Sequence, residues 1–453
     1  EAFARLPAMR NVTLSPDASQ VAFITAADDV SVAVTFDRSK PGSKPVPILR
    51  SEPGEYEISW CNWANNTRLL CGLRAMAREG DRVYPYTRLV GINADGTKLK
   101  MLIQHSPWAR SQFHDRILDW TPDDPDTVLI ELDDDANGFP AVFEVNVNTG
   151  FRYLRVREKM PIRSFRTDSK GNVRLGSGYG SSTEISYFAR LADDKEWRRL
   201  AKIKAFAQGD ELLPIAVAPG KNIAYATGTF EGKSALWQID LTDQAEPQLV
   251  FSHPLVDADD PLLTPDGELL GIWYELDRPF IYYTDEKRRS LIKAIDQAEP
   301  GKFNLIVDRS QDDKLYIIRS YSDVDGGTYS LLDATQGKLQ RVGTAYPELE
   351  SAQLGRMRSI VYKATDGSEI PGYLTVPVGM RAEKLPLIVM PHGGPIARDS
   401  WGFDFLRAFL VDRGYAVLQM NFRGSSGYGD KWFQEAHQDW GGLTYSDITD
   451  GAR

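Results

Sequence analysis

A glycine-containing run near the end of the sequence has the composition of an anion-stabilising loop. Residues 391–395 read Pro-His-Gly-Gly-Pro and follow an apolar run at 387–390 that predicts a buried strand. Glycines after a strand let the backbone turn sharply and point N–H groups outward. Such N–H groups can stabilise the oxyanion that forms when a carbonyl is attacked. We predict that the backbone N–H of Gly394 is an oxyanion donor and that His392 and Gly393 shape the loop; a plain glycine-rich turn is the alternative.

A second glycine-rich run, at residues 421–429, reads Asn-Phe-Arg-Gly-Ser-Ser-Gly-Tyr-Gly and follows the next predicted strand. It lacks the Gly-x-x-x-x-Gly-Lys-Ser/Thr pattern of a phosphate-binding loop and contains no lysine, which argues against nucleotide binding. Arg423 in this run can brace the neighbouring loops or bind a substrate carboxylate, because its planar fork suits carboxylates and carbonyls. Bracing is the favoured role.

Two carboxylates farther along, Asp447 and Asp450, are three residues apart on a predicted helix and therefore share one face. A pair of carboxylates can act as general acid and base. Structural pairing with neighbouring groups is the favoured interpretation.

The two glycine-rich runs and the two aspartates must be positioned by the strands and helices around them. After about residue 355 the pattern predicts an antiparallel pair at 358–363 and 370–376, strands at 387–390 and 415–420, and helices at 403–413, at 430–438 and from 444 onward. Alternation of buried strands with helices predicts a mostly parallel sheet with helices on both faces. Both glycine-rich runs follow strands, where such sheets bind ligands.

The first three quarters of the chain repeat one pattern, in which a turn rich in Pro, Asp and Gly precedes a short β-branched or aromatic run. Seven copies begin near residues 15, 63, 121, 168, 218, 264 and 310. Most are followed by a further strand and turn, as at 89–96 and 329–337. Two hairpins per repeat make one four-stranded propeller blade, and the period of roughly 46–58 residues suits a propeller. We predict an all-β propeller of about seven blades over residues 1–350 and the start of an α/β domain over 351–453; a pair of β-sandwiches is the alternative.

The two glycine-rich runs occur together in one known family. His-Gly-Gly-Pro, the Asn-x-Arg-Gly-Ser-x-Gly-Tyr-Gly run about 25 residues later, and then Trp440, Gly441, Asp447 and Asp450 resemble the prolyl oligopeptidase family of serine peptidases, in its acylaminoacyl-peptidase and dipeptidyl-peptidase-like branch. The resemblance implies an N-terminal propeller that limits access to an α/β-hydrolase domain with a Ser-His-Asp triad. The motif support is confined to residues 386–451, and the propeller match is architectural.

The resemblance also implies that the catalytic serine lies in a Gly-x-Ser-x-Gly elbow beyond Arg453, with the triad Asp and His later still. Ser425 and Ser426 belong to the preceding loop. We therefore expect a serine-type peptidase of short peptides when the hydrolase domain is complete, and no activity from residues 1–453 alone. The alternative is a non-enzymatic propeller binding module with a vestigial hydrolase segment. Whether the peptidase cuts internally or from an end, and which residues it prefers, stays open.

The composition restricts partners and cofactors. The formal net charge is −10 and the acidic residues are scattered, which argues against nucleic-acid binding. No apolar run reaches the roughly 18 residues of a membrane span. The five histidines, at positions 105, 114, 253, 392 and 437, are far apart in sequence, so no metal site or cofactor is predicted. We expect short peptides and the remainder of the hydrolase domain as partners, and possible homo-oligomers. Dipeptidyl peptidases of this family hold the substrate amine with an acidic pair; the acidic run at 133–135 is a candidate, but no pair is assigned.

The two cysteines, Cys61 and Cys71, flank a predicted turn at 65–67. Pairing residues 58–63 with 69–73 about this turn places Cys61 opposite Cys71, within disulfide range, and Trp63 opposite Leu69. A disulfide across one blade would fit an oxidising compartment, so we expect a periplasmic or otherwise secreted protein. Two buried free thiols in a cytoplasmic enzyme are the alternative.

Overall fold

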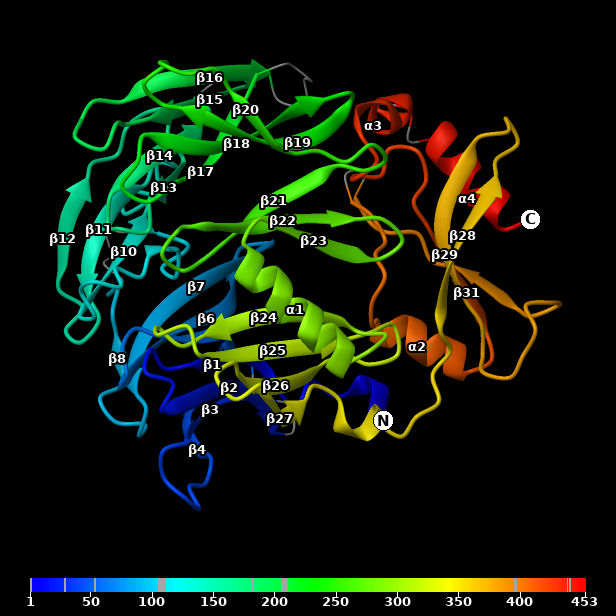
Figure 1. The fold of residues 1–453 in the computed structure, drawn as a ribbon, viewed down its shortest axis with the longest axis horizontal. Helices are drawn as coiled ribbons and strands as arrows, with labels where there is room; N and C mark the ends of the chain where they lie inside the picture. The colour runs from blue at the N-terminus through cyan, green and yellow to red at the C-terminus, as the bar shows by residue number, and fades with distance from the viewer. Residues whose placement is uncertain are drawn as a thin grey trace.

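The computed structural model describes residues 2–27, 30–52, 54–104, 111–180, 183–204, 211–394, 397–437, 439 and 441–453. His105, Pro395 and Trp440 lie outside the described residues. Seven antiparallel sheets formed by the described residues follow one another along the chain and around the left part of Figure 1, and an eighth sheet lies at the right.

The first four sheets each contain four strands in chain order. Their strands are β1 (Arg10–Leu14), β2 (Gln20–Ala27), β3 (Val30–Asp37) and β4 (Val46–Arg50); β5 (Glu57–Trp63), β6 (Arg68–Glu79), β7 (Arg82–Asn93) and β8 (Lys100–Met101); β9 (Ile117–Asp119), β10 (Thr127–Leu132), β11 (Ala141–Asn146) and β12 (Arg152–Val156); and β13 (Ser164–Thr167), β14 (Val173–Gly178), β15 (Glu184–Ala189) and β16 (Arg198–Lys204).

The next three sheets continue this order. Their strands are β17 (Leu213–Val217), β18 (Ile223–Phe230), β19 (Lys233–Asp240) and β20 (Gln248–Phe251); β21 (Ala258–Leu263), β22 (Leu269–Glu275) and β23 (Pro279–Tyr283); and β24 (Phe303–Arg309), β25 (Leu315–Tyr321), β26 (Thr328–Asp333) and β27 (Lys338–Thr344). Short 3-10 helices lie at η1 (Ala2–Ala4) and η2 (Pro347–Leu349).

The repeated turns of the sequence form the first hairpin of each sheet. Each of the seven copies precedes the second strand of its sheet, β2, β6, β10, β14, β18, β22 and β25. In the first sheet the Ser15 hydroxyl donates to Asp17 (2.7 Å) and accepts from the Gln20 N–H (3.0 Å). In the last, Ser310 donates to Asp312 (2.7 Å) and accepts from the N–H of Leu315 (3.0 Å). Side chains that bond their own turn explain why these residue types recur.

Apolar side chains fill the spaces between neighbouring sheets, and the ring closes between the last sheet and the first. At this closure Val12 and Leu14 pack against Ile317 and Tyr329. Asp308 of β24 also accepts a hydrogen bond from the N–H of Leu14 (2.7 Å). Because every sheet shares a core with both neighbours, the seven sheets form a β-propeller, as predicted.

The sixth sheet departs from the predicted four-stranded blade. It has three strands, and helix α1 (Glu286–Ala298) takes the place of a fourth. Asp285 caps this helix by accepting from the N–H of Arg288, and Ile292 and Ile295 pack against the seventh sheet. Figure 1 shows α1 lying alongside β23 and β24. The turn pattern could not reveal this helix, since it marks hairpins rather than outer strands.

The eighth sheet contains β28 (Met357–Lys363), β29 (Glu369–Thr375), β30 (Leu387–Val389) and β31 (Ala416–Met420), in the order β28-β29-β31-β30. Helices α2 (Phe405–Asp412), α3 (Asp430–Ala436) and α4 (Leu443–Gly451) accompany it. The domain boundary predicted at residue 350 lies between β27 and β28.

The prediction of a mostly parallel sheet is wrong for these strands. Only β30 and β31 pair in parallel, while β28–β29 and β29–β31 are antiparallel. The hairpin of β28 and β29 is antiparallel as predicted, so the departure is the antiparallel pairing of β31 with β29. Strands β30 and β31 are joined through α2, a long connection that allows a parallel pair.

Cys61 and Cys71 lie opposite each other in β5 and β6, and Trp63 lies opposite Leu69, so the predicted register is confirmed. The two sulfurs are joined in a disulfide, with the Cα atoms 4.1 Å apart. Both cysteines are buried in the core between the first two sheets.

None of the described helices combines the length and the apolar character that crossing a membrane requires.

Candidate active site

Gly394 lies in the loop after β30, at the end of the parallel pair formed by β30 and β31. Its φ is +68°, a conformation that L side chains rarely adopt, and a Cβ added there would meet no atom within 4 Å. Backbone conformation, not crowding, therefore requires glycine at this position. Gly393 and Gly394 are both exposed, and no acceptor in the described part of the chain takes the Gly394 N–H. An exposed glycine whose N–H has no such acceptor is what an oxyanion donor requires.

His392 is half-buried and holds the beginning of this loop. Its ring stacks on that of Phe422, with centroids 4.4 Å apart and an interplanar angle of 17°. Its Nε2 lies 2.8 Å from the Oγ of Ser425. Burial is the main cause that lowers the pKa of His392, so the ring is neutral at pH 7. These contacts are those of a residue that shapes the loop.

Arg423 is buried (5% exposed) and its whole guanidinium is used within the protein. Nε and one terminal nitrogen donate to the two oxygens of Asp447, at 2.9 and 2.6 Å. The other terminal nitrogen donates to Asp366 (2.7 Å) and to Ser368 (3.3 Å). Asp447 chiefly raises the pKa of Arg423, and hydrogen bonds from the Ser368 N–H and Arg423 hold the pKa of Asp366 at about 2. Arg423 therefore braces α4 against the β28–β29 turn.

Asp447 and Asp450 also serve structure. Asp447 is fully buried and accepts the N–H of Arg423 (3.0 Å) in addition to the guanidinium. Asp450 accepts the N–H and the hydroxyl of Thr365, at 2.7 and 2.9 Å. The Thr365 N–H is the largest cause that lowers the pKa of Asp450. Neither carboxylate is arranged as a general acid–base pair.

The far end of the Gly394 loop is held by Asn421. Its side-chain oxygen accepts the N–H of Asp399 (2.7 Å), and its amide donates to the Asp399 carbonyl (3.0 Å) and to the hydroxyl of Tyr428 (2.8 Å). Burial raises the pKa of Asp399 to about 6. The glycine-rich run at 421–429 thus holds the loop that contains Gly394 in place through hydrogen bonds.

Arg398 connects the same loop to the propeller. Its guanidinium donates to the carbonyls of Glu275 (3.3 Å) and Leu276 (3.2 Å), at the end of β22, and stacks over the ring of Tyr428. Gly427, beside this guanidinium, has a φ of +87°, and this backbone conformation favours glycine at that position. Glu275 in turn accepts from the hydroxyl of Ser400 (2.8 Å).

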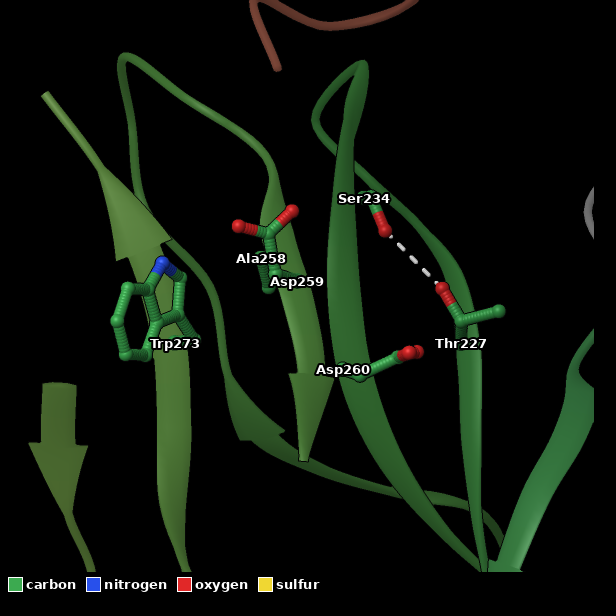
Figure 2. A pocket seen from close by; sticks show the side chains of 6 residues that line it. All are labelled: Thr227, Ser234, Ala258, Asp259, Asp260 and Trp273. Atoms are coloured by element: carbon green, nitrogen blue, oxygen red, sulfur yellow. Dashed lines mark hydrogen bonds between the residues drawn. The ribbon is translucent and has the colours of Figure 1, made fainter. Parts of the chain in front are cut away.

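A pocket of about 480 Å³ lies on the propeller near this contact. Figure 2 shows Asp259 and Asp260 between Trp273 on one side and the hydrogen-bonded pair Thr227 and Ser234 on the other. Adjacent strand residues normally point to opposite faces. Here a bulge between Ala258 and Pro261 brings both carboxylates to the pocket.

Asp259 has an unusual pKa for an exposed carboxylate. Loss of hydration is the largest cause, Arg398 opposes it, and Glu275, Asp257 and Asp260 add to it, so the pKa is raised to about 6. Among the described residues, neither Asp259 nor Asp260 accepts a hydrogen bond or pairs with a cation within 4 Å. The pocket is therefore suited to a cationic group, which two carboxylates and an indole face can all attract.

The acidic run at 133–135 has local roles. Asp133 accepts the N–H groups of Asn137 and Gly138, and Asp134 pairs with Arg152 (2.8 Å). The two acidic residues that do line a pocket, Asp259 and Asp260, were missed. Three carboxylates before Pro261 were the available signal, but the bulge that turns Asp259 and Asp260 to one side is not visible in the sequence.

In the described residues, no group of three or more His, Cys, Asp or Glu side chains is placed to hold a metal ion.

Comparisons with known proteins show similarity to peptidases. The profile of the prolyl oligopeptidase family matches residues 401–453. The chain is 24% identical over 482 residues to dipeptidyl peptidase family member 6 of Caenorhabditis elegans, covering 98% of this chain and 63% of that protein. It is 23% identical over 461 residues to dipeptidyl aminopeptidase BIII of Pseudoxanthomonas mexicana, covering 99% and 64%. The chain thus spans less than two thirds of these relatives' length.

Solved structures share the fold. A puromycin-hydrolysing peptidase of Mycobacterium tuberculosis superposes with a TM-score of 0.67 at 16% identity, over 100% of this chain and 71% of that one. A prolyl endopeptidase gives the same TM-score at 13% identity, over 100% of this chain and 67% of that one. The resemblance of this chain to the prolyl oligopeptidase family of peptidases, predicted from its two glycine-rich runs, is therefore confirmed.

Proposed function

We propose that the complete protein is a serine-type peptidase that hydrolyses short peptides, with the Gly394 N–H as one oxyanion donor. The observation that carries this proposal is the exposed N–H of a positive-φ glycine at the end of the β30–β31 parallel pair. The serine, its general-base histidine and the orienting aspartate would come from the part of the hydrolase domain beyond residue 453. The N–H of the residue after that serine would be the second donor.

The reaction would proceed by acyl transfer. The serine hydroxyl attacks the peptide carbonyl as the histidine removes its proton, and the carbonyl oxygen becomes an oxyanion. A donor that is already in place stabilises this charge without reorganisation. The exposed Gly394 N–H, held at both ends of its loop by His392 and Asn421, meets that requirement.

The full-length protein tests this proposal. We expect hydrolysis of short peptide amides and covalent labelling by a fluorophosphonate, with the labelled peptide lying beyond residue 453. Residues 1–453 alone should show neither activity. Labelling of Ser425 or Ser426 with peptide turnover would show that the nucleophile is misplaced. A full-length protein that binds peptides without cleaving them would instead support a non-enzymatic binding module.

We further propose that the substrate's free N-terminal amine enters the pocket of Asp259 and Asp260, which would make the protein a dipeptidyl peptidase like its relatives from Caenorhabditis elegans and Pseudoxanthomonas mexicana. The unpaired carboxylates support this assignment. The test compares a dipeptide p-nitroanilide with its N-acetyl form. A preference for the free amine that Asp259→Asn abolishes is expected, and equal KM values for the two substrates would contradict the assignment.

The propeller would restrict entry, so that folded proteins are excluded by size. Peptide series of increasing length, assayed with the full-length protein, should show kcat/KM falling with length. The buried Cys61–Cys71 bridge supports a periplasmic or secreted location, which fractionation with detection of the unreduced protein would check.

Self-association of the full-length protein stays a prediction, which light scattering would test.

A further inference from the structure

Ser425 has no role in the proposed acyl-transfer reaction, yet its hydroxyl is buried beside the loop that contains Gly394. It is completely buried, with 0% of its surface exposed. Its Oγ lies 2.7 Å from the carbonyl oxygen of Phe422 and 2.8 Å from Nε2 of His392. A buried hydroxyl with two partners is fully satisfied, so the direction of each hydrogen bond can be worked out.

The carbonyl of Phe422 can only accept, so the hydroxyl proton of Ser425 lies between the two oxygens. Two oxygen atoms 2.7 Å apart without a proton between them would repel each other. The lone pair of Ser425 Oγ then faces His392, so Nε2 of His392 is the donor; the competing contact, from Nδ1 to the carbonyl oxygen of Gly393, is longer at 3.4 Å. Ser425 therefore selects the imidazole tautomer that carries its proton on Nε2.

Phe422 and Ser425 together leave the His392 ring little freedom. The stack on Phe422 fixes the plane of the ring, and the hydrogen bond to Ser425 fixes its rotation within that plane. His392 is two residues before Gly394. A fixed ring at 392 thus fixes the point from which the chain enters the turn at Gly394.

Other contacts hold the opposite end of the loop. The N–H of Ser426 donates to the carbonyl of Ala397 (2.9 Å), and Asn421 brackets Asp399. At the Gly394 end, the ring of His392 is held by Phe422 and Ser425. The backbone of His392 also interacts with the Asp399 carboxylate. Two adjacent serines therefore act on different ends of one loop, one through its side chain and the other through its backbone.

We propose that Ser425 is a positioning residue for the oxyanion donor: it accepts the Nε2–H of His392 and thereby holds the Gly394 N–H toward the reacting carbonyl. This inference rests on the proposed function. Misplacing a catalytic group by about 1 Å can lower a rate about 100-fold. Loss of the Ser425 hydroxyl should therefore lower kcat by roughly 10- to 100-fold and leave KM nearly unchanged.

The test uses three variants of the full-length protein. Ser425→Ala removes the acceptor, and Ser426→Ala is the matched control, because it keeps the backbone N–H that Ser426 uses. Ser425→Thr restores a hydroxyl and should recover activity. If Ser425→Ala does not fold, Ser425→Cys takes its place, since it nearly keeps the volume but is a weak acceptor.

The second readout is the nitrogen chemical shifts of the His392 imidazole, measured by NMR. In the unmodified protein and in Ser426→Ala we expect one tautomer, protonated on Nε2. In Ser425→Ala, or in Ser425→Cys if that variant is used, we expect a mixture of both tautomers. A purely structural role for Ser425 would lower stability without changing this equilibrium.

The outcomes separate the two proposals. Equal kcat in Ser425→Ala and Ser426→Ala, or an unchanged His392 tautomer in Ser425→Ala, would overturn this inference and leave the peptidase assignment intact. An unmodified full-length protein that cleaves no peptide would overturn the proposed function and this inference with it. Reduced kcat together with a mixed tautomer, both reversed by Ser425→Thr, would support it.

Discussion

The propeller and the segment after residue 355 are stabilised in different ways. In the propeller, each sheet is made of consecutive strands, and its turns are closed by side chains only a few residues away, as in the Ser15–Asp17–Gln20 turn. In the C-terminal segment, the decisive contacts join residues far apart, such as Arg423 with Asp366 and Arg398 with the propeller strand β22. In the propeller, stability is distributed over many equivalent local contacts, whereas around the site it depends on a few long-range polar contacts. Single substitutions should therefore have larger effects near the site.

The largest expected loss of stability comes from Arg423→Met. It leaves the fully buried Asp447 without its cation, and such unpaired buried charges cost about 3–5 kcal/mol. Chemical denaturation of the full-length protein measures the change. Arg413→Met is the matched control, because its pair with Asp412 is exposed and contributes at most about 1 kcal/mol. Similar losses in both variants would contradict the contrast between the two regions.

Gly394→Pro should act chiefly on catalysis, with a smaller loss of stability because proline cannot adopt a positive φ. It removes the N–H and forbids the φ of +68°, so kcat should fall by about 10²–10³, or roughly 2.7–4 kcal/mol of transition-state stabilisation. Steady-state kinetics of the full-length protein measure this loss. Gly379→Pro is the control: it also has a positive φ with open space around it, but lies outside the site loop. Retained kcat in Gly394→Pro would exclude this N–H as a donor.

Removal of the Cys61–Cys71 bridge should have a moderate effect confined to the propeller. The bridge closes a short loop, with a sequence separation of 10, so its loss lowers the free energy of unfolding by roughly 2–3 kcal/mol. Thermal unfolding of the Cys61→Ser/Cys71→Ser double variant, with and without reductant, measures it. Two alkylatable thiols in the denatured, unreduced protein would instead show that no bridge forms.

The smallest expected effect is the pH dependence of substrate binding. Asp259, with its pKa raised to about 6, is ionised above that pH and attracts a substrate ammonium, and it loses its charge as the pH falls through about 6. The KM of a free-amine peptide should therefore rise on acidification, by about fivefold because the pocket is open to water. Asp259→Asn should flatten this profile, and an N-acetyl substrate should not show it. A steep profile in Asp259→Asn would assign the titration to another group.

Much of the fold could be predicted because its signals are local. The seven turns, the antiparallel pair β28–β29 and the helices α2 and α4 all depend on residues close in sequence, including the Asp404 cap of α2 and the Gly414 that ends it. Helix α1 was missed because the turn pattern describes hairpins and carries no information about the segment after a third strand. The parallel sheet was wrongly predicted because strand direction depends on connections, not on strand composition.

The sequence by itself determined which loops are candidates for chemistry, because the spacing of the two glycine-rich runs indicated a resemblance to the prolyl oligopeptidase family and pointed to Gly394. The positive φ of Gly394 favours glycine there by backbone geometry. Only the tertiary structure decided which side chains form hydrogen bonds with one another. His392 and Ser425 are 33 residues apart, and Glu275 and Ser400 are 125 apart. The bulge that turns Asp259 and Asp260 into one pocket is likewise a matter of strand pairing. A side chain's type states what it can bond, but which group it meets depends on how distant segments pack, because hydrogen bonds act over about 3 Å and leave no trace in the spacing of residues.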